Sequence, residues 1–290
     1  MHDVRMKRHA ERIIGTILSL SLAFASGCET NPYTGRSQLL MTSVSQEMQL
    51  GAQAYNQVKN DPKMKPSQDS REIEPVKRVA ARIVEAAKRS KYAEMAQQFQ
   101  WEVTVIKDDK TANAFALPGG KMAVYTGIFP MAKTEAGLAA VMGHEVVHAL
   151  ARHGAERMSQ GQLTSAALQV AGAAAGASGM NPLLSQGTMA ALGAGAQVGV
   201  LLPFSRKHES EADYIGILLA ADAGYDPRES VALWERMAQM SGGGGPAEFM
   251  STHPSNETRI DQLKKWLPEA MTIYQSKQPV PAAELPPVGR

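Results

Sequence analysis

The interpretation of the whole chain depends on one stretch, His144-Glu145-Val146-Val147-His148. Its two histidines are four residues apart, so on a helix both imidazoles project from one face and can reach a single metal ion. Glu145 is placed beside them to take a proton from a water molecule at that ion. The stretch lies within the apolar run from Leu138 to Leu150, where two histidines without a partner would be costly to bury. The pattern therefore favours a metal site over an incidental ion pair.

The same helix does not supply a third metal ligand. In the extended motif with a third histidine, position 151 would be glycine and position 154 histidine, but they are Ala151 and Gly154, and His153 is one residue short. Nothing in the sequence breaks the helix at position 151, as that geometry would require. The third ligand is therefore expected from elsewhere in the chain.

The acidic stretch from Glu209 to Asp213 is the candidate source. Glu209 and Asp213 are spaced i, i+4, so they share one face of a helix. Glu209 would complete the His₂Glu site of a catalytic zinc, which we favour over iron or manganese. Asp213 would hydrogen-bond a ligand histidine from behind. Glu211 fits an exposed acidic patch, so its replacement by alanine is expected to matter little.

Four blocks of sequence together resemble the M48 family of zinc metallopeptidases (HtpX/Ste24/OMA1-related). They are Asn113-Ala114-Phe115-Ala116-Leu117-Pro118-Gly119-Gly120, the stretch 144–148, Ser205-Arg206-Lys207-His208-Glu209-Ser210-Glu211-Ala212-Asp213, and Thr252-His253-Pro254. The resemblance covers residues 40–270. It implies one Zn²⁺ per chain, held by His144, His148 and Glu209, and an endopeptidase that hydrolyses peptide bonds with a zinc-activated water and Glu145 as general base.

The resemblance also suggests where a substrate would bind. In zincins, a peptide adds as a strand to the exposed edge of a sheet. The expected hairpin from Asn113 to Tyr125 is the candidate, and its glycines allow close backbone approach. The candidate substrate strand comprises Asn113, Ala114, Phe115, Ala116, Gly119 and Gly120.

His253 is a tentative further catalytic residue. It follows the four glycines 242–245 and precedes Pro254. It would either donate a hydrogen bond to the oxyanion of the tetrahedral intermediate, or occupy the fourth zinc position in place of water and keep the enzyme inactive. A third interpretation is a histidine at a helix entry with no catalytic part. A glycine-rich hinge suits a mobile ligand better than a preorganised donor, so the blocking role is favoured.

The hydrophobic patterning predicts a mainly α fold with a small β-sheet (α+β), a zincin-like (gluzincin) domain over residues 43–274. Helical spacing and helix stop signals predict that Gly154 and Gly224 end two of the helices. The alanine- and glycine-rich stretch 162–202 is expected to be a helical insertion. The expected helices are 45–59, 72–89, 134–152, 206–223, 227–240 and 255–267, and the expected strands are 101–105, 113–117 and 122–125.

Residues 1–27 are expected to be a lipoprotein-type signal peptide. A basic start precedes the apolar run Ile13–Ala25, which is too short to span a bilayer. Small residues then lead into Cys28, the only cysteine in the chain, in a pattern that resembles a bacterial lipobox. Lipidation of Cys28 would attach the protein to a membrane.

The mature chain would then begin with a tether, residues 28–42, and end in a disordered proline-rich tail, residues 275–290. By resemblance to the bacterial sorting pattern, Glu29 after the cysteine favours the periplasmic side of the outer membrane. The alternative is ordinary cleavage after Ala25, which would leave a soluble periplasmic protein.

The composition narrows the function further. The 290 residues are 44% hydrophobic with a net charge of +2, which is too balanced for a nucleic-acid-binding protein. The partners expected are protein or peptide substrates, in quality control of periplasmic or outer-membrane proteins.

Two alternative functions stand beside this hypothesis of a zinc endopeptidase. One is a non-catalytic zinc-binding lipoprotein or chaperone, against which the presence of Glu145 argues. The other is a membrane-embedded M48 protease that uses 162–202 as a hairpin.

Overall fold

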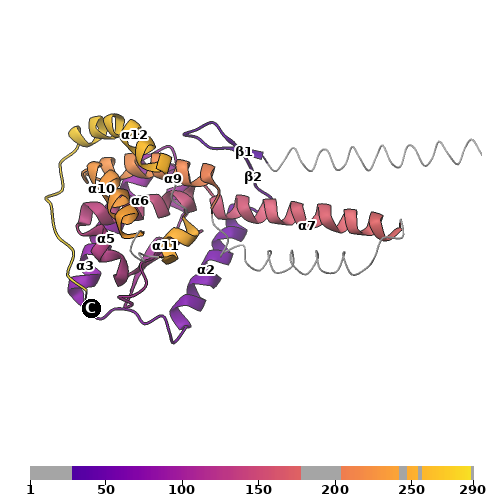
Figure 1. Cartoon of the computed structure of the whole chain (residues 1–290), viewed down its shortest axis with the longest axis horizontal. Helices are drawn as coiled ribbons and strands as arrows, with labels where there is room; N and C mark the ends of the chain where they lie inside the picture. Colours follow the sequence, from indigo (N-terminus) through magenta and orange to yellow (C-terminus); the bar gives the residue numbers. More distant parts are fainter. Residues whose placement is uncertain (1–27, 178–203, 242–246, 254–256, 289–290) are drawn as a thin grey trace, which may run out of the picture.

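The computed structural model describes residues 28–177, 204–241, 247–253 and 257–288 (Figure 1). The longer helices are α2 (Val44–Asn60), α3 (Ser70–Arg89), α6 (Glu135–Leu150), α7 (His153–Ala177), α9 (Arg206–Asp222), α10 (Arg228–Ser241) and α12 (Glu257–Gln275). The short ones are α4 (Ala93–Gln98), α5 (Phe129–Ala132) and α11 (Ala247–Thr252). The strands are β1 (Cys28–Thr30), β2 (Ser37–Leu39), β3 (Glu102–Ile106), β4 (Ala114–Leu117) and β5 (Lys121–Tyr125). The predicted mainly helical α+β fold is confirmed.

Helix α6, which carries the 144–148 stretch, runs through the core (Figure 1). It begins after Thr134, whose hydroxyl accepts a hydrogen bond from the amide of Gly137 at 3.1 Å, an N-cap that satisfies one free donor of the first turn. Helix α9 packs against it very closely. A Cβ atom on Gly143 or on Gly216 would come within 2.9 Å of the other helix's backbone. Two glycines therefore let the two site-bearing helices approach.

Helix α6 ends in a way that the sequence did not indicate. Gly154 was expected to take the left-handed conformation after the helix, but Arg152 takes it, with a φ of 56°, and Gly154 lies inside α7. The buried side chain of Arg152 stabilises this conformation by donating hydrogen bonds to Glu47 at 2.6 Å and to the Thr42 carbonyl at 2.7 Å. These long-range partners outweigh the local preference for glycine.

The three-stranded sheet has the order β3-β5-β4. Strand β3 pairs with β5 in parallel, and β4 pairs with β5 as an antiparallel hairpin. The hairpin turns at Gly119 and Gly120, both with a φ of 86°, as the sequence pattern predicts. Strand β4 lies beside α6, and in the described part of the chain no strand pairs with its other edge.

The segment expected to be a tether is folded onto the domain. Strands β1 and β2 form an antiparallel hairpin at the base of α7 (Figure 1). The side chain of Gln38 is buried and donates a hydrogen bond to the carbonyl of Ala151 at 2.7 Å. A free linker over residues 28–42 was therefore the wrong expectation, because polar residues of the hairpin find buried partners on the domain.

The C-terminal segment also differs from its expectation. Helix α12 does not end at Pro268 but continues to Gln275, because Ala270 in its last turns is buried in the core. Residues 276–288 then run along the domain. The carbonyl of Ala283 accepts from the amide of Glu135 at 2.9 Å, and Leu285 is buried. The described part of the tail therefore satisfies a free donor at the start of α6, and the expectation of disorder was wrong for residues 276–288.

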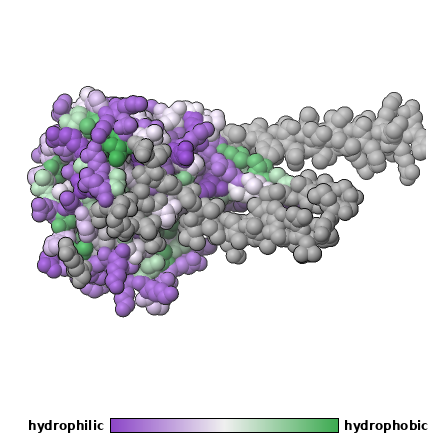
Figure 2. All heavy atoms as spheres, in the orientation of Figure 1, coloured by the Kyte–Doolittle hydropathy of each residue, from purple (hydrophilic) through white to green (hydrophobic). Residues whose placement is uncertain are grey.

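The alanine- and glycine-rich stretch is helical as far as it is described, since α7 extends away from the body to Ala177 (Figure 1). Among the described helices, none is both long enough and apolar enough to cross a bilayer. The rest of the expected insertion and the expected signal peptide lie outside the described residues. The face of the body seen in Figure 2 is mostly hydrophilic, with hydrophobic residues in small groups.

Candidate metal centre

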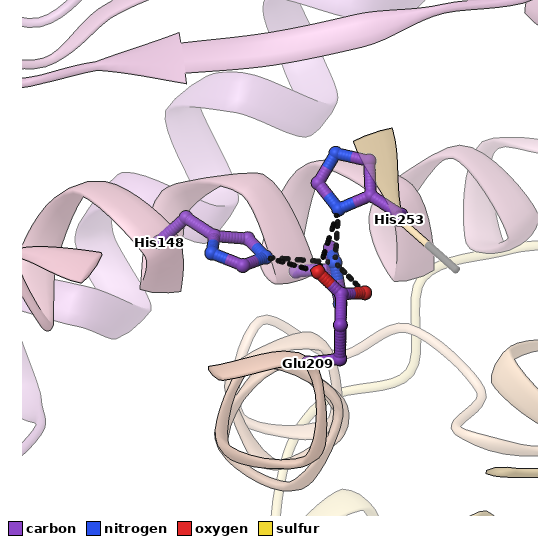
Figure 3. Close-up of side chains that lie close together, drawn as sticks. His148, Glu209 and His253 are labelled. Carbon is purple, nitrogen blue, oxygen red and sulfur yellow. Dashed lines mark hydrogen bonds and ion pairs between the residues drawn. The ribbon is translucent and has the colours of Figure 1, made fainter. Parts of the chain in front are cut away.

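Four side chains from three segments converge in the core. His144 and His148 project from α6, Glu209 from the first turn of α9, and His253 directly follows α11. Figure 3 shows His148, Glu209 and His253 turned toward one another. All four residues are buried, and one nitrogen or oxygen atom of each lies within 4.8 Å of the others. The structure thus brings together the two histidines and the glutamate singled out in the sequence.

The donor atoms face one another at short range. The Nε2 atoms of His144 and His148 are 3.0 Å apart, and Nδ1 of His253 is 3.2 Å from Nε2 of His144. A carboxylate oxygen of Glu209 lies 3.1 Å from that Nδ1 and 3.4 Å from Nε2 of His148. Each imidazole nitrogen either donates or accepts, so three of them that point to one place cannot all satisfy one another by hydrogen bonds. Two histidines and a carboxylate around a common point are a donor set that zinc prefers, so these residues fit the metal.

The electrostatics of the cluster also suit a cation. Burial alone would raise the pKa of Glu209, but its close contacts with the imidazoles of His144, His148 and His253 outweigh it and hold that pKa well below its usual range. Burial alone would lower the pKa of His144, but hydrogen bonds to Asp213 and Glu209 raise it to about 9. Burial lowers the pKa of His148, which keeps its ring neutral. The two carboxylates thus attract positive charge to the point that the imidazole nitrogens face.

Asp213 lies behind His144. Its Oδ1 atom is 2.9 Å from Nδ1 of His144, so that nitrogen donates and the ring turns Nε2 toward the cluster. This is the contact expected from the i, i+4 spacing of Glu209 and Asp213.

Arg259 is a site residue that the sequence analysis missed. Its guanidinium lies 2.9 Å from Glu209 Oε2 and 2.5 Å from Asp213 Oδ2, and it covers the Trp234 ring at 3.4 Å from the ring centroid. A buried arginine thus neutralises both carboxylates. The sequence held one signal for this role. A basic residue in the first turn of a helix interacts unfavourably with the helix dipole unless an acidic side chain outside the helix compensates it.

Aromatic rings hold two of the histidines. Phe204 stacks on His148 with ring centroids 3.9 Å apart. His253 lies between Phe204 and Phe249, at centroid distances of 5.5 and 4.6 Å. Ring packing therefore limits how these imidazoles can rotate.

Glu145 reaches the edge of the same cluster. Its Oε1 atom is buried without a hydrogen-bond partner among the described residues, and it lies 3.4 Å from Nε2 of His253. Burial raises the pKa of this carboxyl group. A buried carboxylate oxygen without a partner, beside a cluster of candidate metal ligands, can accept a hydrogen bond from a water molecule or from the substrate.

Glu211 is not where the sequence analysis expected it. It is 5% exposed, and its carboxylate contacts His153 and Arg36 at 3.1 and 2.7 Å. The expectation of an exposed acidic patch was therefore wrong. It failed because the partner of Glu211 comes from the N-terminal hairpin, far away in sequence.

The candidate substrate strand corresponds to β4 and its turn. Ala114 is buried, Phe115 and Ala116 are half-buried, and Asn113 precedes the strand. Gly120 packs against Trp101, where a Cβ atom would meet the indole ring at 2.9 Å. The candidate substrate strand is thus β4, which is an edge strand among the described strands and lies beside α6, the helix that carries His144 and His148.

Comparison with known proteins finds a family match over most of the domain. The profile of peptidase family M48 matches residues 73–267. The chain is 40% identical over 82% of its length to the mitochondrial metalloendopeptidase OMA1 of Schizosaccharomyces pombe. It is 33% identical over 85% of its length to the human mitochondrial metalloendopeptidase OMA1, and 31% identical over 84% to the beta-barrel assembly-enhancing protease of Escherichia coli. It spans 66% of the fission-yeast relative and about half of the other two, 47% and 48%.

Proposed function

The chain belongs to peptidase family M48, and on that premise we propose that it is a zinc-dependent endopeptidase with His144, His148 and Glu209 as its zinc ligands. The membership confirms the predicted family of metallopeptidases. The observation that carries the proposal is the buried convergence of two imidazoles and a carboxylate beside the unsatisfied Glu145. Relatives across yeast, human and E. coli are named as metalloendopeptidases or as a protease.

The residues divide the chemistry as follows. Zinc at this site would act as a Lewis acid toward water and toward the scissile carbonyl group. Glu145 takes a proton from the attacking water and returns it to the leaving amine. Its raised pKa supports this role, because a base that must also act as an acid works best when its pKa approaches the ambient pH. Asp213 keeps the His144 ring turned toward the metal position.

The substrate binds as an added strand along the edge of β4 with which no described strand pairs. A strand at a sheet edge offers backbone donors and acceptors to the backbone of an extended peptide. Strand β4 also lies beside α6, so a peptide on it would run near the metal cluster. This arrangement suits an enzyme that cuts unfolded or misfolded proteins of varied sequence.

His253 is assigned the blocking role. Its Nδ1 atom lies 3.1 Å from Glu209 and 3.2 Å from His144, in the position of a fourth metal ligand. A ligand there would compete with water until the segment carrying it moves away. The opposite role, donation to an oxyanion, remains the competing hypothesis, and the two predict opposite effects of removing the imidazole.

We propose that the protein is a lipoprotein at the periplasmic face of the outer membrane, anchored through Cys28, with a soluble periplasmic protein as the alternative. This placement rests on the lipobox-like sequence before Cys28. The E. coli relative is named for β-barrel assembly, which agrees with quality control of outer-membrane proteins, whereas the yeast and human relatives are named mitochondrial.

The test of the function uses the purified full-length chain and casein as the substrate. We expect about one zinc per chain, internal cuts in casein by mass spectrometry, loss of cleavage with a chelator and recovery when zinc is restored. Zinc binding without any cleavage would instead support the non-catalytic zinc protein. Cleavage that resists complete removal of the metal would contradict the proposal.

A further inference from the structure

A second group of buried polar residues lies behind the metal cluster, on the other side of His148. The Nδ1 atom of His148 is 3.0 Å from Nδ1 of His153, and Nε2 of His153 is 3.1 Å from a carboxylate oxygen of Glu211. Glu211 in turn accepts hydrogen bonds from Arg36 at 3.0 and 2.7 Å. A continuous chain of contacts therefore runs from a residue of the N-terminal hairpin to a candidate zinc ligand.

The donors and acceptors in this chain have one consistent order. If Nε2 of His148, which faces the cluster, is the atom that binds zinc, its Nδ1 carries the proton and donates to His153. His153 then accepts at Nδ1, which places its own proton on Nε2, where it donates to Glu211. Glu211 can accept that bond because it is a carboxylate held by the guanidinium of Arg36. Each link fixes the tautomer of the next.

Arg36 is the cation on which the chain depends. Besides Glu211, it binds the carboxylate of Glu156 at 2.6 and 2.8 Å, and its side chain is only 20% exposed. Glu156 also accepts from His208 at 3.1 Å and from Gln38, a second residue of the hairpin, at 3.0 Å. Without Arg36, two buried carboxylates would lose their shared counter-charge, and both would turn to other partners.

We propose that Arg36 is a positioning residue of the metal site, which acts through Glu211 and His153 to fix the ring orientation and tautomer of the ligand His148. This inference rests on the proposed function, since it takes the cluster to be a zinc site. It makes the hairpin that begins at Cys28 a working part of that site. A ligand histidine whose far nitrogen is held in this way binds metal more tightly than one free to rotate.

The competing explanation is that Arg36 only fastens the hairpin to the domain. The hairpin offers a matched control for that role, because Glu29 fastens it by an ion pair with Arg152 at 2.5 Å and takes no part in the chain to His148. Glu29→Ala therefore removes one contact between the hairpin and the domain while leaving Arg36, Glu211 and His153 in place.

The experiment compares full-length wild type, Arg36→Ala, His153→Phe, Glu211→Ala and Glu29→Ala. Zinc affinity is measured by competition with a chromophoric chelator, below the unfolding temperature of every variant. The visible spectrum of the cobalt(II)-substituted protein reports the ligand geometry. We expect Arg36→Ala, His153→Phe and Glu211→Ala to bind zinc about 10- to 100-fold more weakly than wild type and to shift the cobalt bands. Glu29→Ala is expected to resemble wild type in both zinc affinity and cobalt spectrum.

Arg36→Lys keeps the inference testable if Arg36→Ala fails to fold. A lysine preserves the charge but cannot bridge two carboxylates with a planar fork, so its zinc affinity is expected between those of wild type and His153→Phe. Arg36 and His153 variants with the affinity and cobalt spectrum of Glu29→Ala would overturn the inference and leave the proposed function intact. A wild-type chain that binds no zinc would overturn the proposed function as well.

Discussion

Gly143 of α6 and Gly216 of α9 lie against each other with almost no space between the two backbones. A Cβ atom on Gly143 would stand 2.9 Å from the carbonyl oxygen of Gly216, and one on Gly216 would stand 2.9 Å from the amide nitrogen of His144. Glu209 and Gly216 are seven residues apart, so they share a face of α9. The contact between the two glycines therefore sets how far Glu209 stands from the histidines of α6.

Gly216→Ala is expected to weaken both the fold and the metal site, because the added methyl group must push α9 away from α6. Overpacking of this kind costs about 1–3 kcal/mol of the free energy of unfolding. We also expect weaker zinc binding, measured by chelator competition. Gly154→Ala is the matched control, since a Cβ atom there has no described atom within 4 Å. If Gly216→Ala unfolds and binds zinc like the control, the helix contact does not set the site.

Glu209→Ala is expected to abolish stable zinc binding. It removes one of three ligands, which should exceed the about 10- to 100-fold loss caused by removing an outer partner. Metal content after dialysis, measured by atomic absorption, gives the answer. Glu85→Ala, at an exposed position of α3 paired with Lys88, serves as the control. Full zinc content in Glu209→Ala would mean that the third ligand is another residue, and His253 would be the first alternative.

His253→Ala decides between the two roles of that imidazole. If His253 blocks the fourth metal position, its removal should raise the rate of casein cleavage at unchanged zinc content. If it stabilises an oxyanion instead, the rate should fall by a factor of about 100 or more, as for other oxyanion donors. A lower rate with full zinc content would contradict the blocking role. An unchanged rate would remove His253 from the mechanism.

The sequence predicted the site best where the signal is local. The i, i+4 spacings in α6 and α9 placed His144, His148 and Glu209 correctly on two helix faces, because helical periodicity alone decides which side chains share a face. Thr134 and Gly224 likewise marked a helix start and a helix end by local backbone chemistry. These residues needed no knowledge of the tertiary structure.

The misses all depend on partners far away in the chain. Glu211 looked exposed because Arg36 is 175 residues away, and Arg259 was overlooked because Trp234 and the two carboxylates meet it only in the folded state. The same is true of the C-terminal segment. Its prolines indicate an extended chain, but the backbone bonds to α6 that order it cannot be read from composition.

Cys28→Ser tests the predicted lipid anchor. Without the thiol, no acyl chain can be attached, so we expect the precursor to keep its signal peptide or to be mislocalised. Metabolic labelling with palmitate in a bacterial host, followed by membrane fractionation, measures both effects. Ser37→Ala, a neutral change in the same hairpin, controls for folding. Labelling that persists in Cys28→Ser would exclude Cys28 as the modified residue.

Glu145→Gln provides the most direct test of a catalytic zinc site with a carboxylate base. The amide has nearly the same shape as the carboxyl group, and Glu145 is not a ligand, so zinc should remain bound at wild-type stoichiometry. Glutamine cannot accept the water proton, so casein cleavage should fall to near background, a loss of about 100- to 10,000-fold for a missing general base. The measurement is zinc content and cleavage rate on the same purified samples. Full zinc with almost no cleavage is the predicted result, and full zinc with wild-type cleavage would contradict the account.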